Sequence, residues 1–263
     1  MNHPSLAALP LVRRRIGEAE VAATPAIVDD LAALVASHGT AYEWAAQQPQ
    51  PRALRGRAPV YVAALPASND LVVVRHAWHG GLLAPLSTDR FRNTRRAEAE
   101  YATSVRLRQH AVPTTDVLGF VSYPAGFGCV RVDVVSRLVQ DAFDLGMIVA
   151  GLVPEIDRDD ALAATRTLLL RLAAEGVVHP DLNVKNILVV RASTGHLTAM
   201  VIDVDVVRWD AGRTPADTME ANVARLIRSM RKWRRQFGCP LSDDLLEQFA
   251  RAARAGTDDG ARR

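Results

Sequence analysis

The stretch that decides the fold is Val177-Val178-His179-Pro180-Asp181-Leu182-Asn183-Val184-Lys185-Asn186, which leads directly into an apolar run at residues 187–190. Pro180 cannot continue a regular helix, and it pushes the preceding His179 toward an extended conformation. The stretch is therefore predicted to be a loop that directs its polar side chains outward. A second apolar run at 198–203 follows a short turn, which predicts a β-hairpin with polar residues at both mouths, and hence a site.

Within this loop, the pattern His-x-Asp-Leu-x-x-x-Asn matches the catalytic-loop signature of kinases. Only the arginine of that signature is missing, because Pro180 stands in its place. In kinases the aspartate accepts the proton of the acceptor hydroxyl, and the asparagine ligates a metal ion. Asp181 is therefore the candidate catalytic base, and Asn186 is a candidate metal ligand. The alternative is a capped loop without catalytic function.

A second candidate metal ligand ends the apolar run of the hairpin. Asp203 lies seventeen residues after Asn186, at the place where kinases hold a metal-binding aspartate after a buried strand. Two oxygen ligands at neighbouring strand ends would suit Mg²⁺, with nucleotide phosphates and water completing the octahedron. Asp203 could instead end a strand-terminal turn. Asp205 could be a further ligand or an ion-pair partner of Arg208, and we favour the structural role.

Kinases also hold the α/β-phosphates with a cation on a strand, and a carboxylate on the next helix orients that cation. No lysine precedes Lys185 in this chain, and Arg75 ends an apolar run at the expected position. Arginine can bridge phosphates through two N–H groups. Glu98 and Glu100 both lie on the following helix, and we favour Glu100 because it shares a helix face with Leu107. An exposed surface carboxylate is the alternative.

Two glycines that follow this strand, Gly80 and Gly81, could present backbone N–H groups to the phosphates of a nucleotide. Adjacent glycines also mark ordinary turns. No Gly-x-Gly-x-x-Gly precedes the strand, and residues 56–61 contain a single glycine. A phosphate-binding loop at that position would therefore be degenerate.

Three segments resemble the lipopolysaccharide kinase family, which includes Kdo kinase and the heptose kinases. They are Val74-Arg75-His76-Ala77-Trp78-His79-Gly80-Gly81, His179-Pro180-Asp181-Leu182-Asn183 with Asn186, and Ile202-Asp203-Val204-Asp205. The resemblance covers about residues 52–235 and departs from the family pattern at Ala77, Pro180 and Val204. It implies a two-lobed, protein-kinase-like fold and transfer of the γ-phosphoryl group of ATP to a sugar hydroxyl of the lipopolysaccharide inner core, above all that of Kdo.

By matching positions, the resemblance also implies a role for each candidate residue. Asp181 would be the base, Asn186 and Asp203 the Mg²⁺ ligands, and Arg75 with Glu100 the phosphate clamp. About fourteen residues separate Asp203 from the helix that follows, which is too short for a peptide-binding activation segment and favours a sugar or glycolipid acceptor. Two other functions stay open: a small-molecule phosphotransferase of the aminoglycoside or choline type, and a non-catalytic pseudokinase.

The hydrophobic periodicity predicts an α+β, two-lobed fold with a β-rich N-lobe and a helical C-lobe. Residues 52–139 are predicted to form the N-lobe, with strands and one long helix at 92–109. Residues 140–255 are predicted to form the C-lobe, which contains the catalytic loop. Residues 1–51 are expected to be a helical extension, and residues 256–263 a flexible tail.

The 263 residues are 49% hydrophobic and 23% charged, an ordinary globular composition that excludes disorder, collagen and coiled coil. No stretch reaches the roughly 18 uncharged apolar residues that a membrane-spanning helix needs. The first arginines follow the first apolar patch instead of preceding it, unlike a secretory signal. We therefore expect a cytoplasmic protein. Cys129 and Cys239 are the only cysteines, too few for a zinc site.

The formal net charge is only +3, but basic residues gather near the C-terminus. They are Arg225, Arg228, Arg231, Lys232, Arg234 and Arg235. Such a strip can attract an anionic membrane surface, or it can be a solvated helix face. We expect no nucleic-acid partner, and we expect peripheral contact of residues 225–235 with the cytoplasmic face of the inner membrane.

Overall fold

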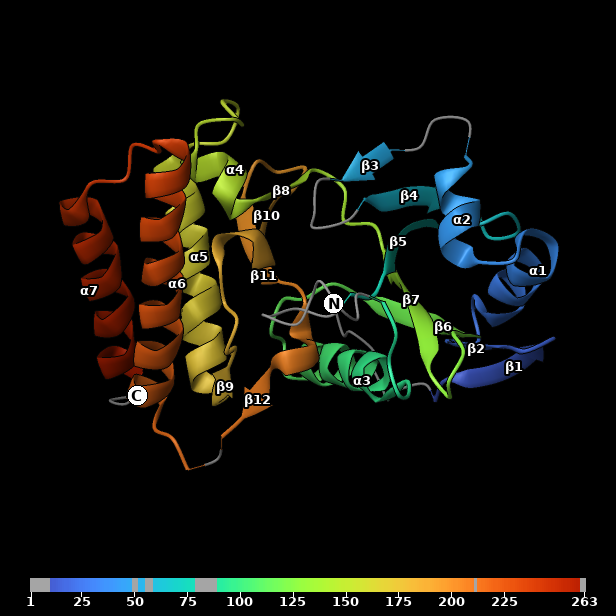
Figure 1. Ribbon diagram of the computed structural model, residues 1–263. Coiled ribbons are helices and arrows are strands. Elements are labelled where there is room, and N and C mark those ends of the chain that lie inside the picture. The colour runs from blue at the N-terminus through green and yellow to red at the C-terminus, as the bar shows by residue number, and fades with distance from the viewer. Residues whose placement is uncertain (1–9, 49–51, 55–58, 79–88, 211, 261–263) are drawn as a thin grey trace. The chain divides into compact units, whose positions relative to one another are not determined.

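The computed structural model describes residues 10–48, 52–54, 59–78, 89–210 and 212–260. The chain divides into two compact units, of which the N-terminal unit comprises residues 1–106 and 115–138, and the C-terminal unit comprises residues 107–114 and 139–263. Strands dominate the first unit and helices dominate the second (Figure 1). The predicted α+β fold with a β-rich N-lobe and a helical C-lobe is confirmed.

The N-terminal unit is built on a seven-stranded sheet in the order β1-β2-β6-β7-β5-β4-β3. Each neighbouring pair of strands is antiparallel. The strands are β1 (Val12–Ile16), β2 (Ala19–Ala23), β3 (Arg52–Leu54), β4 (Val60–Ala64), β5 (Leu71–His76), β6 (Val117–Pro124) and β7 (Val130–Arg137). The hairpin predicted around residues 60–75 is formed by β4 and β5.

Helices cover both faces of this sheet. Helices α1 (Val28–His38) and α2 (Ala41–Ala46) pack on one face, and helix α3 (Arg95–Gln109) packs on the other. Successive side chains of a strand point to opposite faces, so the neighbours Phe120 and Val121 of β6 enter the two different cores. The predicted long helix at 92–109 is therefore α3, and its orientation decides which of its carboxylates faces the sheet.

The helical extension expected over residues 1–51 is wrong for residues 12–23, which form β1 and β2. The strand β2 pairs with the central strand β6, so these residues are part of the sheet. Three successive arginines occupy the exposed middle of β1 and conceal its strand period, while β2 is rich in alanine, a good helix former. Pairing with β6 overrides that local preference. Helix α1 does end at Gly39, whose φ of 84° is left-handed, as the sequence predicts.

The C-terminal unit consists of helices packed against a small sheet of the order β11-β10-β8. Helices α5, α6 and α7 lie side by side in Figure 1 and share one core. The elements are β8 (Ala142–Asp144), α4 (Leu145–Val149), α5 (Arg158–Ala174), β9 (Val177–Val178), η1 (Val184–Asn186), β10 (Ile187–Arg191), β11 (Leu197–Val201), η2 (Val204–Val206), β12 (Arg208–Trp209), α6 (Pro215–Phe237) and α7 (Asp243–Gly260). The predicted hairpin is β10–β11.

Asp144 ends β8 and caps α4 by accepting a hydrogen bond from Met147 N. One detail of this unit differs from the sequence analysis, which expects residues 256–263 to be a flexible tail. Helix α7 extends to Gly260, so residues 256–260 belong to a helix. No helix in the described part of the chain is long and apolar enough to span a membrane.

Residues 107–114 belong to the C-terminal unit although they precede β6 of the other unit. Leu107 and Val112 are fully buried in the core of the C-terminal unit. Thr114 forms a parallel bridge with Val201 at the end of β11, and its hydroxyl donates to the Val201 carbonyl at 2.8 Å. The chain thus contributes one segment to the C-terminal unit before it completes the N-terminal sheet.

Candidate active site

The loop at residues 179–186 joins β9 to β10, as the sequence predicts. Leu182 N donates to the His179 carbonyl at 3.0 Å, which closes a tight turn around Pro180. The Asn183 side chain accepts from Lys185 N at 2.9 Å, so it caps η1. Leu182 itself is fully buried and anchors the loop in the core. The Asp181 side chain, in contrast, is 44% exposed and is therefore accessible from solvent.

Hydrogen bonds bring together the three candidate residues of this unit: Asp181, Asn186 and the segment of Asp203. Asn186 Nδ2 donates to the Asp181 carbonyl at 3.0 Å, which leaves the amide oxygen of Asn186 for a ligand. Ile202 N donates to the Asn186 carbonyl at 2.9 Å, so the segment that carries Asp203 is bonded to the end of the loop. Asp203 has φ 60° and ψ 52°, a left-handed conformation that is uncommon outside glycine and typical of functional sites.

His179 forms the buried centre of the loop. Its Nε2–H donates to the Ile202 carbonyl at 3.3 Å, and its backbone N–H donates to the Asn222 side chain, which in turn donates to the Val177 carbonyl. Burial lowers the pKa of His179. Nearby carboxylates oppose this shift, and they are Asp203, Asp181 and Asp205. The imidazole lies between the loop and the end of β11, where it contacts the Ile202 carbonyl.

Helix α6 holds the loop from one side. Arg225 Nη2 lies 2.6 Å from Asp181 Oδ1 and forms an ion pair with it. Val184 N donates to the Ser229 hydroxyl at 3.2 Å. Three residues of α6 contact the loop, and they stand three and four positions apart: Asn222, Arg225 and Ser229. They therefore share one face of the helix. Sequence analysis missed this role of Arg225, although the spacing of three polar residues on an otherwise apolar helix face was a signal.

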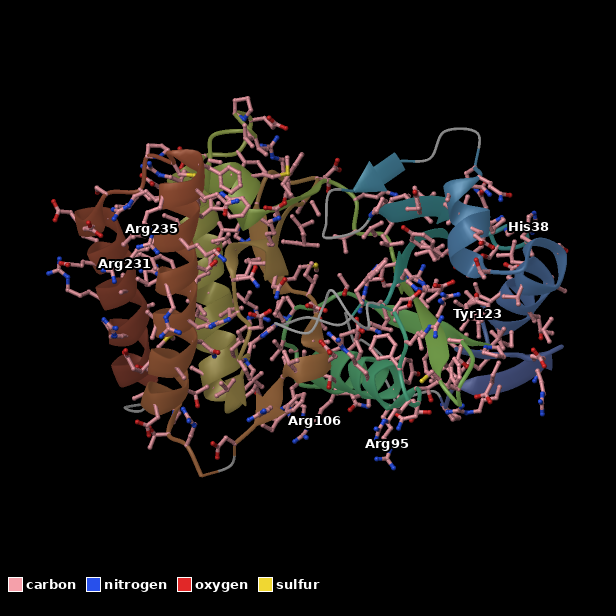
Figure 2. All side chains as sticks on the ribbon, viewed as in Figure 1. His38, Arg95, Arg106, Tyr123, Arg231 and Arg235 are labelled. Atoms are coloured by element: carbon pink, nitrogen blue, oxygen red, sulfur yellow. The ribbon has the colours of Figure 1, made fainter. Side chains whose placement is uncertain are left out.

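The basic strip at residues 225–235 is not one surface, which corrects the expectation of a single membrane-facing strip. Arg225 turns to the catalytic loop, and Arg234 donates to the Leu241 carbonyl and pairs with Asp243. Three other arginines line a groove of about 710 Å³ between α6 and α7: Arg228, Arg231 and Arg235. Figure 2 labels two of them, Arg231 and Arg235, on α6. The helical period distributes the strip over several directions.

In the N-terminal unit, Arg75 at the end of β5 forms an ion pair with Glu100 of α3. Glu100 is only 6% exposed, so it is not a surface carboxylate. Glu98 points elsewhere, because it pairs with Arg13 at 2.8 Å, and this hydrogen bond lowers the pKa of Glu98. Of the two predicted carboxylates, the one that contacts Arg75 is therefore Glu100. Gly80 and Gly81 lie outside the described residues.

The sequence analysis did not identify a buried carboxylate that lies next to this pair. Asp133 on β7 is 1% exposed and lies 2.6 Å from Nδ1 of His76, the neighbour of Arg75 on β5. It also accepts a hydrogen bond from Tyr42 N at 3.0 Å. The signal was a single aspartate inside an apolar strand, since a carboxylate at such a position is buried only with partners. Asp133 thus fixes the end of β5 that carries Arg75.

The donor set of the C-terminal unit fits Mg²⁺. The described residues hold no cluster of three or more His, Cys, Asp or Glu side chains suited to a metal ion. Mg²⁺ needs no such cluster, since it is usually bound by one or two carboxylates and completes its shell with phosphate and water oxygens. One carboxylate, Asp203, and one amide oxygen, Asn186, match this requirement. Cys129 and Cys239 are both free thiols.

Comparison with known proteins adds an independent result. The sequence matches the model of a family described as the lipopolysaccharide kinase (Kdo/WaaP) family over residues 43–251. No curated protein matches the sequence. A similar solved structure is described as WaaP in complex with acyl carrier protein, with 16% sequence identity and a TM-score of 0.43. That match covers 78% of this chain and 88% of the other.

Proposed function

Because the chain belongs to the lipopolysaccharide kinase (Kdo/WaaP) family, we propose that it transfers the γ-phosphoryl group of ATP to a Kdo hydroxyl in the lipopolysaccharide inner core. Family membership supports a phosphotransferase of lipopolysaccharide biosynthesis, and the acceptor, ATP and Mg²⁺ are part of our proposal. One observation carries it: hydrogen bonds join Asp181, Asn186 and the segment of Asp203 at one place in the C-terminal unit. This grouping supplies a base and two oxygen ligands.

The base of the proposed reaction is Asp181. Its Oδ1 accepts from Arg225 at 2.6 Å, which fixes the carboxylate and leaves Oδ2 for the acceptor hydroxyl. Asp181 would orient that hydroxyl toward the γ-phosphorus and take its proton as the new P–O bond forms. The leaving group is ADP, and phosphoryl transfer of this kind depends mainly on positioning. A carboxylate held by an arginine suits that demand.

Each unit, taken by itself, carries candidate groups for binding a nucleotide. In the C-terminal unit, the Asp203 carboxylate and the Asn186 amide oxygen would ligate Mg²⁺, which when bound neutralises charge on the β- and γ-phosphates. In the N-terminal unit, Arg75 would bind the α- and β-phosphates through its guanidinium, while Glu100 keeps the guanidinium in place. The charge pattern of the candidate residues therefore suits ATP with Mg²⁺.

A membrane-bound glycolipid acceptor is reached at a membrane surface, and we propose that the protein attaches peripherally to the cytoplasmic face of the inner membrane.

The chain between η2 and α6 is short: it contains β12 and reaches the first turn of α6 at Pro215. This leaves no long segment for binding a peptide substrate, which favours a sugar acceptor.

The test is transfer of label from [γ-³²P]ATP to purified Kdo-lipid A precursor with Mg²⁺, comparing the native protein with Asp181→Asn. The matched control is Asp210→Asn, because Asp210 is also paired with an arginine, Arg213 at 2.9 Å, and is similarly exposed but lies outside the loop at residues 179–186. We expect labelled glycolipid from the native protein and the control. Asp181→Asn should lower the rate by orders of magnitude, since it removes the base.

The assay distinguishes the remaining possibilities. If the native protein binds Mg-ATP but labels no Kdo acceptor, the acceptor part of the proposal is wrong, and aminoglycosides and choline are the next acceptors to test. If it binds no nucleotide, the protein is a pseudokinase. Equal label with Asp181→Asn and Asp210→Asn would refute Asp181 as the base.

A further inference from the structure

A hairpin tip in the N-terminal unit presents an aromatic side chain that the proposed reaction does not use. Strands β6 and β7 are joined by a short turn in which Phe127 stands between Gly126 and Gly128. Phe127 is 98% exposed, the highest value among the large hydrophobic side chains of the described residues. Its φ is 52°, and those of the two glycines are 75° and 69°. A left-handed conformation is unfavourable for a bulky residue, so both solvation and backbone conformation oppose this placement.

The tip is nevertheless well ordered by hydrogen bonds. Ala125 N donates to the Cys129 carbonyl at 2.8 Å, and Cys129 N donates to the Gly126 carbonyl at 2.9 Å. Just behind the turn, Phe91 and Val130 exchange two backbone hydrogen bonds of 2.8 and 2.7 Å. The tip is therefore a rigid projection, and the bridge places the segment around Phe91 directly beside it.

That neighbouring segment is strongly basic. Five exposed arginines lie on it or next to Val130: Arg90, Arg92, Arg95, Arg96 and Arg131. Between residues 89 and 97 the only acid is Asp89, which pairs with Arg131 at 2.6 Å. Arg92 and Arg95 make no side-chain hydrogen bond or ion pair with the described residues, and Figure 2 shows Arg95 pointing away from α3.

The position of these charges adds a second argument for an anionic partner. Helix α3 begins at Arg95, so Arg95 and Arg96 occupy its first turn. The helix dipole favours negative charge at this end and disfavours cations. An anion bound here would interact favourably with the arginines and with the helix terminus at the same time. Glu98 also lies in this first turn, and Asn93 Oδ1 accepts from Arg95 N, so a bound anion would act mainly on the two arginines.

We propose that this projection is a membrane-contact surface, with Phe127 inserted into the interfacial region of an anionic phospholipid bilayer and Arg92 and Arg95 bound to lipid phosphates. Aromatic and basic side chains are the residues that favour this interface. The tip is convex and offers a single apolar side chain, because its neighbours Ala125, Gly126 and Gly128 are small. A protein partner would need a larger contact area, whereas a fluid bilayer accommodates one projecting ring without a preformed pocket.

Sedimentation with vesicles tests this proposal without nucleotide or acceptor, so its outcome is separate from that of the kinase assay. The vesicles are phosphatidylcholine alone or phosphatidylcholine mixed with phosphatidylglycerol. We expect binding to the mixed vesicles, weakened by added salt. Phe127→Ser should lower the partition coefficient about tenfold or more, and the double change Arg92→Gln with Arg95→Gln should lower it by roughly an order of magnitude or more.

The chain offers matched controls for both changes. Leu152→Ser removes another exposed apolar side chain, 65% exposed, in the C-terminal unit. The double change Arg228→Gln with Arg235→Gln removes the same charge from α6. Both controls should bind vesicles like the native protein, and thermal unfolding confirms that each variant is folded. The proposal is overturned if no binding to anionic vesicles occurs, if Phe127→Ser and Leu152→Ser bind equally, or if the α6 variant alone loses binding.

Discussion

Arg225 and Asp181 form the contact on which the site of the C-terminal unit depends most directly. An ion pair between partly exposed groups contributes little to stability, so we assign its value to orientation of the carboxylate. A carboxylate that has lost its partner can rotate, and misplacement of a reacting group by about 1 Å can cost roughly 10²-fold in rate. Arg225 is thus a positioning residue, and its effect should appear in turnover.

We expect Arg225→Ala to lower kcat at least tenfold while the KM for ATP changes little, because Arg225 contacts Asp181, the proposed base, and not the proposed phosphate clamp. Arg225→Lys should restore part of the loss, since one ammonium donor can still reach the carboxylate. Steady-state kinetics at varied ATP measure both parameters. Arg228→Ala, on the same helix but facing the groove with α7, is the control, and equal effects of the two alanine variants would contradict the assignment.

Glu100 provides a second prediction at the scale of single residues. Glu100→Gln removes the charge that holds Arg75, so the guanidinium should bind the α/β-phosphates less well and the KM for ATP should rise, by about tenfold or more. Glu98→Gln, two positions away on the same helix, removes a carboxylate that pairs with Arg13 instead. It should leave the KM unchanged. Steady-state kinetics at varied ATP measure both KM values, and the reverse order of effects would exclude the clamp.

Spacing along the chain was sufficient to predict which residues of the loop come together. The pattern from Asp181 to Asn186 and the strand end at Asp203 are local features, and the choice of Glu100 over Glu98 followed from one helix face. The partner of Asp181 was not predictable in this way, because Arg225 stands 44 residues further along and nothing local links the two. A long-range ion pair requires the packed fold.

Helix α6 shows how one element serves two purposes. Asn222, Arg225 and Ser229 face the catalytic loop, while Arg228, Arg231 and Arg235 face α7. A stretch that looks uniformly basic in the sequence is thereby divided by a period of 3.6 residues. The capping box of Thr214 and Asp217 begins the helix and fixes which residues fall on which face. The sequence analysis treated these charges as one basic strip, whereas the structure distributes them over different faces of α6.

The strand β6 gives a prediction at the scale of elements. A Cβ atom added to Gly119 would lie 2.5 Å from the Ala22 carbonyl oxygen and from Ala23 Cα, both backbone atoms of the adjacent β2. Gly119→Ala should therefore push the two strands apart and cost about 1–3 kcal/mol of the free energy of unfolding. Urea denaturation measures this cost.

Gly212→Ala is the matched control for that substitution. Its added Cβ would meet only the Asp210 side chain at an ordinary 3.5 Å, and we expect its unfolding midpoint to stay close to that of the native protein. If both alanine variants unfold at the same urea concentration, close approach of β2 and β6 does not limit stability.

The elements of the C-terminal unit were easier to predict than those at the start of the chain. Long helices such as α5 and α6 have clear periods and caps, so their existence followed from the sequence. The strands β1 and β2 did not, because β1 exposes three arginines and β2 is rich in alanine. These residues form strands because β2 pairs with β6. That pairing brings together residues some hundred positions apart in the sequence, so no local pattern predicts it.

At the scale of the whole molecule, ligand binding should raise the free energy of unfolding. A ligand at about 100 times its Kd adds roughly 2.7 kcal/mol to the folded state, so ATP with Mg²⁺ should raise the melting temperature of the native protein. Chelation of the metal with EDTA should remove most of this increase, since in the proposed site Asp203 and Asn186 would contact the phosphates only through the metal. Thermal unfolding with and without EDTA measures the difference.

Asp203→Asn should abolish the part of the increase that depends on Mg²⁺, whereas Asp210→Asn should keep it. An unchanged response of Asp203→Asn to EDTA would mean that the metal is held elsewhere. Both variants should melt like the native protein in the absence of nucleotide, because each replaces a partly exposed carboxylate by its isosteric amide.

The segment 107–114 has a consequence for any attempt to divide the protein. A fragment that starts at residue 139 would lack Leu107 and Val112, two buried residues of its own core, and the bridge between Thr114 and Val201. It would expose apolar surface and leave the end of β11, just before Asp203, without support. A single cut therefore cannot yield two self-sufficient pieces, and the C-terminal unit can be obtained alone only by grafting these eight residues back onto it, for example as an added peptide or through circular permutation.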